Sequence, residues 1–248
     1  MAEVSRRQFH QAGLGSLLTF SVLEFLFSQD AFAEVVKPIT TRWLADLDSL
    51  GRDLKGQKLS QLDWQDKVEE LLSRVQLDEL LQFIDFEKLR RHEIKDRGES
   101  SVRLKFPEVE GLPTQLVFGH QMFALKKGRS VAPHGHDNMA TAFLILNGDF
   151  QGRHYDRVED VGKESMIVKP TINRPFGRGD YSTVSDDKDN VHWFTATSAT
   201  GFIFNIHVMS VKPGRTGRVY IDPQGESLEG GLLKCRRISA EEAYKLYG

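Results

Sequence analysis

The stretch that decides the fold is GRSVAPHGHDNMATAFLILNG, residues 128–148, in which a single glycine separates His134 from His136. Successive side chains on a β-strand point to opposite faces, so residues two apart face the same way. Both imidazoles can therefore reach one point, and imidazole suits Fe, Zn, Cu and Ni. The apolar run that follows ends at Asn147-Gly148, a pair typical of tight turns between strands. The stretch predicts a metal-binding strand followed by a buried strand.

The glycines around this histidine pair have a distinctive spacing. Gly128 lies six residues before His134, and Gly148 lies twelve residues after His136. The pattern resembles the first motif of the cupin family: glycine, five residues, His-x-His, three or four residues, glutamate, six residues, glycine. Thr141 stands at the glutamate position, and a threonine hydroxyl is a poor ligand for a divalent transition metal. The resemblance implies a mainly β fold, the cupin double-stranded β-helix or jelly-roll barrel.

A third histidine ligand is expected from a later strand. His192 begins an apolar run, residues 191–197, directly after the polar turn 186–190. The second cupin motif places its histidine at such a point, although the proline and glycine usual before it are missing here. The metal ligands implied are His134, His136 and His192. We expect the polar turn itself to be solvated rather than to bind calcium.

Three histidines without a carboxylate are also the metal site of the thiol dioxygenase branch of the cupins. Over about residues 110–222 the sequence resembles plant cysteine oxidases and cysteamine dioxygenases, and the similar segments are 133–143, 153–156 and 190–196. This resemblance implies Fe(II) as the cofactor, with O2 and a small thiol or an N-terminal cysteine as substrates.

Three further side chains are candidate catalytic residues. Tyr155 and Tyr220 could donate a hydrogen bond to bound oxygen. His207 shares one face of the alternating run 202–209 with Asn205. Two interpretations of that pair stay open: the two side chains hydrogen-bond to the metal ligands, or they form a structural pair. His154 and Tyr155 must point to opposite faces of their strand, and the sequence does not say which face is internal.

The chain divides into three segments. Residues 34–95 are expected to be helical, because apolar residues recur at three- and four-residue steps, with a helix start at Ser60. Residues 96–248 are expected to form the cupin barrel, because short β-branched and aromatic runs alternate with turn residues. A last helix is expected from Ser239, with Glu242 completing a capping box. We expect the early helices to pack against the barrel or cover one of its mouths.

Residues 1–33 have the layout of an export signal. Arg6-Arg7 precedes a moderately apolar run, which ends in Ala31-Phe32-Ala33, a small-x-small cleavage pattern. The paired arginines resemble a twin-arginine signal. The run is too short, and too interrupted by Glu24, to make a stable membrane span. The segment predicts an exported protein, periplasmic or extracellular, that engages the twin-arginine machinery and has no stable membrane span when mature.

Composition excludes some function classes and leaves others open. The 248 residues carry a formal net charge of −2, which argues against a nucleic-acid binder. The lone cysteine, Cys235, excludes an intrachain disulfide and an all-cysteine zinc site. A homodimer through an edge strand is expected. Three functions remain: the Fe(II) thiol dioxygenase, a cupin that binds a metal or small ligand without oxidising it, and a cupin enzyme of another reaction type using Zn, Mn, Ni or Cu.

Overall fold

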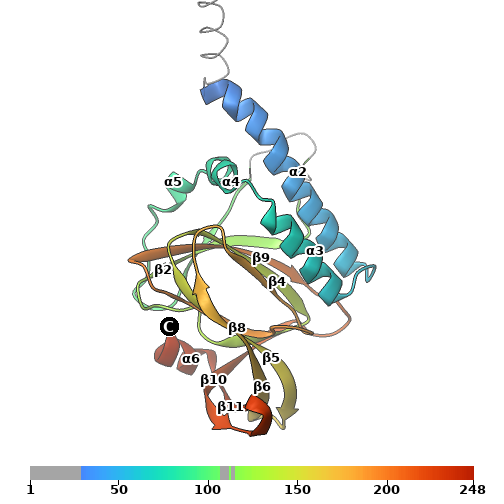
Figure 1. Cartoon of the computed structure of the whole chain (residues 1–248), viewed down its shortest axis with the longest axis vertical. Helices are drawn as coiled ribbons and strands as arrows, with labels where there is room; N and C mark the ends of the chain where they lie inside the picture. Colours follow the sequence, from blue (N-terminus) through green and yellow to red (C-terminus); the bar gives the residue numbers. More distant parts are fainter. Residues whose placement is uncertain (1–28, 107–111, 113–114) are drawn as a thin grey trace, which may run out of the picture.

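The computed structural model describes residues 29–106, 112 and 115–248 (Figure 1). Residues 1–28 of the expected signal lie outside the described residues, and residues 29–33 form the start of the first helix described. In the described part of the chain, no helix is both long enough and apolar enough to cross a membrane.

The N-terminal region is helical, as its periodicity predicts. Its helices are α2 (Gln29–Lys55), α3 (Gln61–Ser73), α4 (Leu77–Phe83) and α5 (Phe86–Leu89). The hydroxyl of Ser60 accepts a hydrogen bond from the Asp63 backbone N–H at 3.0 Å, which caps α3 where the sequence predicted its start. Trp64, Val68 and Leu72 form the buried stripe of α3.

Eleven strands and two short helical segments follow among the described residues. They are β1 (Ser100–Arg103), β2 (Gly119–Lys126), β3 (His134–Asp137), β4 (Met139–Asn147), β5 (Phe150–Val161), β6 (Ser165–Phe176), β7 (Tyr181–Val184), β8 (Val191–Ala196), β9 (Thr200–Met209), β10 (Gly217–Ser227), the 3₁₀ turn η1 (Glu229–Gly231), β11 (Leu233–Ile238) and α6 (Ala240–Tyr247). The capping box predicted for the last helix is present, since Ser239 Oγ accepts from the Glu242 N–H at 3.1 Å.

The strands form two antiparallel sheets that face each other. One sheet has five strands in the order β1-β2-β9-β4-β7, and the other contains the order β6-β5-β8-β3. From β3 to β9 the chain crosses between the sheets at every step except the β5–β6 hairpin, which is the topology of a jelly roll. The mainly β, cupin-type double-stranded β-helix with an N-terminal helical segment is therefore confirmed.

A second small barrel extends the jelly roll. The hairpin of β10 and β11 pairs with β3 on one side and with β6 on the other, which closes this sheet on itself. Figure 1 shows the ends of β5 and β6 together with β10 and β11 as a lobe below the main body. We call this part the closed lobe.

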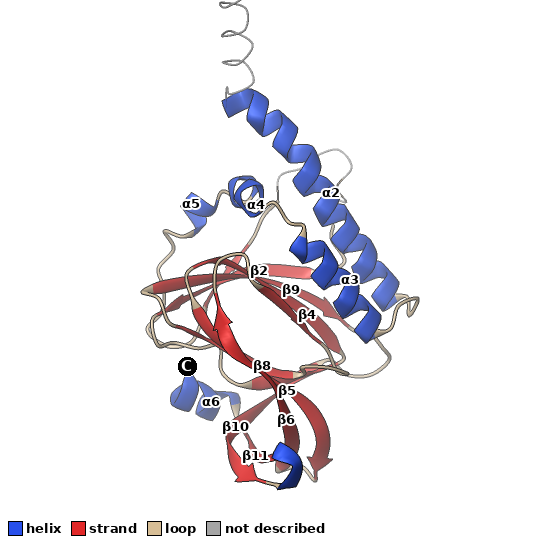
Figure 2. Cartoon of the chain, viewed as in Figure 1, coloured by secondary structure: helices blue, strands red, loops and turns tan. Residues whose placement is uncertain are grey.

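Three apolar cores hold these layers together. The helices cover the outer face of the five-stranded sheet, where Trp43, Trp64 and Phe204 are buried (Figure 2). A second core lies between the two sheets and includes Phe143 and Phe194. A third fills the closed lobe, and its buried members are Met166, Val168, Val191, Ile221 and Cys235. The expectation that the helices pack on the barrel is confirmed.

Candidate metal centre and its surroundings

The structure brings the three predicted ligands together at the interior end of the jelly roll. His134 and His136 lie on β3, and His192 lies on β8 directly opposite His134 in the antiparallel register. The potential ligand atoms of the three residues all lie within 4.8 Å of one another. Each side chain is at most 3% exposed. Residues 58 positions apart in sequence thus form one buried imidazole cluster, because β3 and β8 are neighbours.

Backbone carbonyls fix the proton on two of these rings. His134 Nδ1 lies 2.8 Å from the Ala132 carbonyl oxygen, and His192 Nδ1 lies 3.0 Å from the Asn190 carbonyl oxygen. A carbonyl can only accept, so each Nδ1 donates its proton and each neutral ring keeps a lone pair on Nε2. That is the tautomer a metal-binding histidine needs.

The third ring is held by the residue that stands where the family motif has glutamate. Thr141 Oγ1 lies 3.2 Å from His136 Nδ1 and 3.0 Å from His207 Nδ1. If His136 Nδ1 donates to this hydroxyl, the hydroxyl donates to His207 and the lone pair of His136 Nε2 is free. Thr141 therefore orients one of the three imidazoles, and no carboxylate takes part in the cluster among the described residues.

His207 is the end of this hydrogen-bonded chain. It lies opposite Thr141 on β9, and its Nε2 is 3.0 Å from the Asn205 side-chain amide and 3.3 Å from that of Gln121. Asn205 Oδ1 has no partner among the described residues. An amide flip of Asn205 would let its Oδ1 accept a hydrogen bond from His207 Nε2. The two interpretations left open for Asn205 and His207 merge, since the pair is both buried and linked to a ligand through Thr141.

Burial keeps all of these imidazoles neutral. It is the largest cause lowering the pKa of His192 to about 4 and that of His207 to about 3. The pKa values of His134 and His136 also lie well below the ordinary value, first through burial and then through the charges of neighbouring groups. His134 Nε2 and His136 Nε2 face each other at 3.1 Å. Neutral nitrogens converging in a buried place fit a divalent transition metal, which would share their lone pairs.

The turn before β8 is exposed at Asp187 and Lys188, as predicted, but its last two residues are buried beside the site. Asp189 is 4% exposed and Asn190 is 1% exposed. Asn190 Nδ2 donates to the carbonyl oxygens of His136 at 2.8 Å and Ser185 at 2.9 Å, which ties the turn to the ligand strand. A Cβ on Gly135 would lie 2.5 Å from Asn190 Oδ1, so the residue between the two ligands has to be small.

The two predicted tyrosines have different surroundings. Tyr220 lies opposite His134 on β10, with its ring centroid 5.6 Å from that imidazole. Tyr155 lies on the other face of β5, where its ring stacks on Trp193 at 5.3 Å and an interplanar angle of 9°. The expectation that Tyr155 faces the metal site is therefore corrected: alternation along β5 directs its side chain into the closed lobe.

The inward-facing neighbour of Tyr155 is His154, a residue whose direction the sequence left open. It is fully buried, and its ring centroid lies 6.1 Å from that of His192. Neither ring nitrogen has a partner among the described residues. Burial lowers its pKa well below the ordinary value, so it is a neutral ring packed against Phe176 and Phe194.

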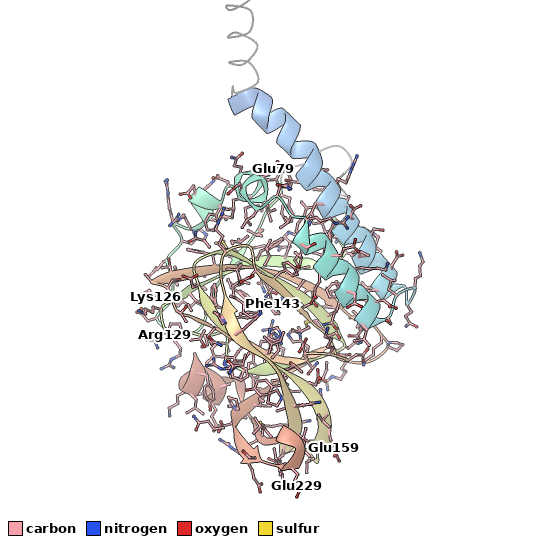
Figure 3. All side chains as sticks on the ribbon, viewed as in Figure 1. Glu79, Lys126, Arg129, Phe143, Glu159 and Glu229 are labelled. Carbon is pink, nitrogen blue, oxygen red and sulfur yellow. The ribbon has the colours of Figure 1, made fainter. Side chains whose placement is uncertain are left out.

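Two cavities adjoin the cluster. A void of about 10 Å³ inside the jelly roll is lined by His134, His192 and Phe143, whose side chain is labelled in the interior in Figure 3. A cleft of about 900 Å³ opens on the surface beside it. His207 and Arg218 line both cavities, so these two residues separate the cleft from the imidazoles. Sequence analysis missed Arg218, whose only signal was its position two residues before Tyr220.

No protein-family model and no curated protein matches the chain. Among solved structures, an oxalate oxidase in complex with glycolate has a TM-score of 0.36 and 14% identity, covering 51% of this chain and 56% of its own. An uncharacterised double-stranded β-helix protein from Klebsiella pneumoniae has a TM-score of 0.34 and 12% identity, covering 53% and 85%. Procruciferin from Brassica napus has a TM-score of 0.32 and 9% identity, covering 42% of this chain. Only 23% of the procruciferin chain is matched. The jelly-roll strand order and the buried three-histidine cluster rest on the geometry of this chain itself.

Proposed function

We propose that the protein is a non-haem Fe(II) dioxygenase that oxidises a small thiol or an N-terminal cysteine with O2. The observation that carries the proposal is the convergence of three neutral imidazoles with no carboxylate beside them. His134, His136 and His192 would hold the metal. When bound there, Fe(II) would supply open coordination positions and the redox chemistry that joins a thiol to O2. The net reaction, R–SH plus O2 giving R–SO2H, needs no other reductant.

The charge of the ligand set supports a thiol substrate. Neutral ligands would leave the full positive charge of a bound metal at the site, and a nearby cation lowers the pKa of a thiol. A carboxylate in place of Thr141 would cancel part of that charge. The chain's own hydroxyl instead holds the His136 ring and leaves the charge intact.

Other residues of the site exclude water and orient the ligands. Phe143 packs on His192 with ring centroids 5.1 Å apart and closes the interior side. Asn190 holds the backbone of His136. Tyr220, beside His134, is the proposed hydrogen-bond donor to the substrates.

Oxygen uptake tests the proposal. The chain is reconstituted anaerobically with Fe(II) and offered small thiols and peptides that begin with cysteine, with metal content measured on the same sample. We expect uptake with sulfinate formation, lost in His134→Ala and His192→Ala, and depressed in Thr141→Glu. Bound metal without uptake on any thiol would refute the dioxygenase and favour the cupin that binds a metal or small ligand without oxidising it.

We also propose that residues 1–33 direct export by the twin-arginine route and are then removed. The paired Arg6-Arg7 and the Ala31-Phe32-Ala33 pattern support this proposal. Intact mass of the protein recovered from the periplasm or medium tests it, with a mature N-terminus at Glu34 expected. Arg6→Lys together with Arg7→Lys should keep the protein in the cytoplasm, and unchanged export of that variant would contradict the proposal.

A further inference from the structure

Among the described residues, the charged side chains that line the surface cleft beside the imidazole cluster are cationic. Three cationic side chains line it, Arg103 and Lys105 from the end of β1 and the loop after it, and Arg218 from β10. No Asp or Glu lines the cleft among the described residues. Within the same part of the chain, none of the three cations takes part in an ion pair of 4 Å or less. Cations gathered around a concave surface attract anions.

The wall of the cleft is apolar. Leu104, Phe118 and Met139 line it and are at most 5% exposed, so they are fixed by the protein core behind them. Met209 lines the same wall and is 50% exposed, a high value for a large apolar side chain. Exposed apolar surface in a cavity of about 900 Å³ favours an organic ligand over an inorganic ion.

Arg218 is where the cleft and the metal centre meet. It lies opposite His136 in the register of β10 with β3, and it lines both the cleft and the small interior void. An anionic group that paired with Arg218 would therefore sit at the inner end of the cleft, next to the imidazoles.

We propose that this cleft binds an organic anion with an apolar body, its carboxylate paired with Arg218 and its chain lying along the wall that Phe118 and Met209 form. The guanidinium group suits a carboxylate because its donors match the two oxygens. The inference specifies the ligand class of the proposed site, and it rests on the proposed function only as far as this ligand is a substrate. Binding to the cleft itself requires no metal.

Isothermal titration calorimetry on the full chain, treated with chelator to remove metal, tests the inference. Octanoate is compared with octanamide, which has the same chain without the charge. We expect octanoate to bind at least tenfold more tightly than octanamide. In the series butyrate, hexanoate, octanoate, affinity should rise by about threefold per added methylene as apolar surface is buried.

Two variants and a matched control locate the binding. Arg218→Gln should weaken octanoate at least tenfold and leave octanamide unchanged. Met209→Ser should weaken octanoate more than butyrate. Arg215→Gln removes the same charge from an exposed site that lines a different surface groove, and it should change affinity less than twofold.

Three results would overturn the inference: no octanoate binding at millimolar concentration, equal affinity for octanoate and octanamide, or equal losses in Arg218→Gln and Arg215→Gln. All three are read on metal-free protein. Failure of the proposed function appears instead as absent oxygen uptake in the metal-loaded chain, so either idea can fail without the other.

Discussion

The two faces of strands β5 and β8 are built for different purposes. Toward the five-stranded sheet they present His154, His192 and Phe194, which surround the metal centre or pack beside it. Toward the closed lobe they present Tyr155 and the two neighbours of His192 in sequence, Val191 and Trp193. One face holds convergent nitrogens, and the other is an apolar core. The same two strands thus separate the imidazole cluster from an apolar core by alternation alone.

The contrast between the two faces shows how the protein accommodates several buried imidazoles. Buried imidazoles cost free energy unless their nitrogens are paired. Carbonyl acceptors and Thr141 satisfy the Nδ1 atoms, while the Nε2 atoms are left to a metal. The lobe behind needs no such pairing, because its core is apolar, and it can support the ligand strands from the back.

The largest expected effect is a loss of metal affinity in a variant of the face that carries the imidazoles. His192→Ala removes one of three ligands, and metal affinity should fall more than a thousandfold. The matched variant is Val191→Ala, one residue away on the lobe face, which should keep the metal and lower the free energy of unfolding by about 2 kcal/mol. Metal titration monitored by calorimetry, with urea unfolding of the same samples, checks both. Equal metal loss in the two variants would show that alternation does not separate the faces.

The next largest effect is a loss of stability in a variant of the face that points into the closed lobe. Trp193 is 6% exposed, stacks on Tyr155 and lies under the guanidinium of Arg153, 5.7 Å from its ring centroid. Trp193→Ala should lower the free energy of unfolding by about 3 kcal/mol, because a large buried ring is lost. The metal-to-protein ratio of the folded fraction should not change. Loss of metal from well-folded protein would contradict the separation of the two faces.

The sequence predicts the metal face better than the lobe. His-x-His on a strand, a histidine after a polar turn and the glycine spacing all carry chemical constraints, and the three ligands they indicate meet in the structure. The lobe has no such signature. Strand β11 (LKCRRI) mixes cations with apolar residues in a way that also suits a surface segment.

Side-chain direction was the part that sequence could not supply. Tyr155 and His154 are adjacent, so exactly one could face the ligands, and only the pairing of β5 with β8 decides which. The burial of Asp189 and Asn190 escaped prediction because the composition of the turn 186–190 is that of a solvated loop. The position of the turn depends on contacts far away in sequence, such as the hydrogen bond from the Asp186 N–H to Gln61 on α3.

A third prediction concerns the role of the Thr141 hydroxyl in metal affinity. Thr141→Val keeps the shape of the side chain and removes the hydroxyl that bridges His136 and His207. Metal affinity should fall by about 10- to 100-fold, because the ligand ring loses the partner that sets its tautomer. Thr141→Ser retains a hydroxyl and should restore most of the affinity. If Val and Ser behave alike in metal titrations, the bridge has no role in ligation.

Tyr220 and Tyr155 lie on opposite sides of this separation, so thiol turnover in their variants tests it. Tyr220→Phe should lower thiol turnover about tenfold at unchanged metal content, since it removes the hydroxyl of the ring that lies beside His134. Tyr155→Phe should stay within twofold of the unmodified chain, because that ring faces the lobe. Steady-state oxygen uptake at matched Fe(II) loading measures both, and a larger effect at Tyr155 would reverse the assignment.

The smallest expected effect is a pH dependence of stability that comes from an ion pair in the closed lobe. Asp160 pairs with Arg157 at 2.5 Å and with Arg237, and hydrogen bonding to Arg157 is the main reason that its pKa falls from 3.8 to about 2. A depressed carboxyl pKa contributes stability above the unfolded value, and that contribution is lost as the pH falls from about 4 through about 2. The Asp160 side chain is 40% exposed. Solvent screening then limits the contribution to about 0.5–1 kcal/mol.

Asp160→Asn removes this pairing at every pH. The difference in urea midpoint between Asp160→Asn and the unmodified chain should therefore be present at pH 6 and shrink below pH 4. Asp46→Asn, an exposed position on α2 with no ion pair among the described residues, should show no such pH-dependent difference. Because the ion pair lies in the lobe, metal affinity at pH 7 should be unchanged in both variants. A weaker metal site in Asp160→Asn would mean that the lobe does more than support β3 and β8 from behind, and that the two faces are coupled.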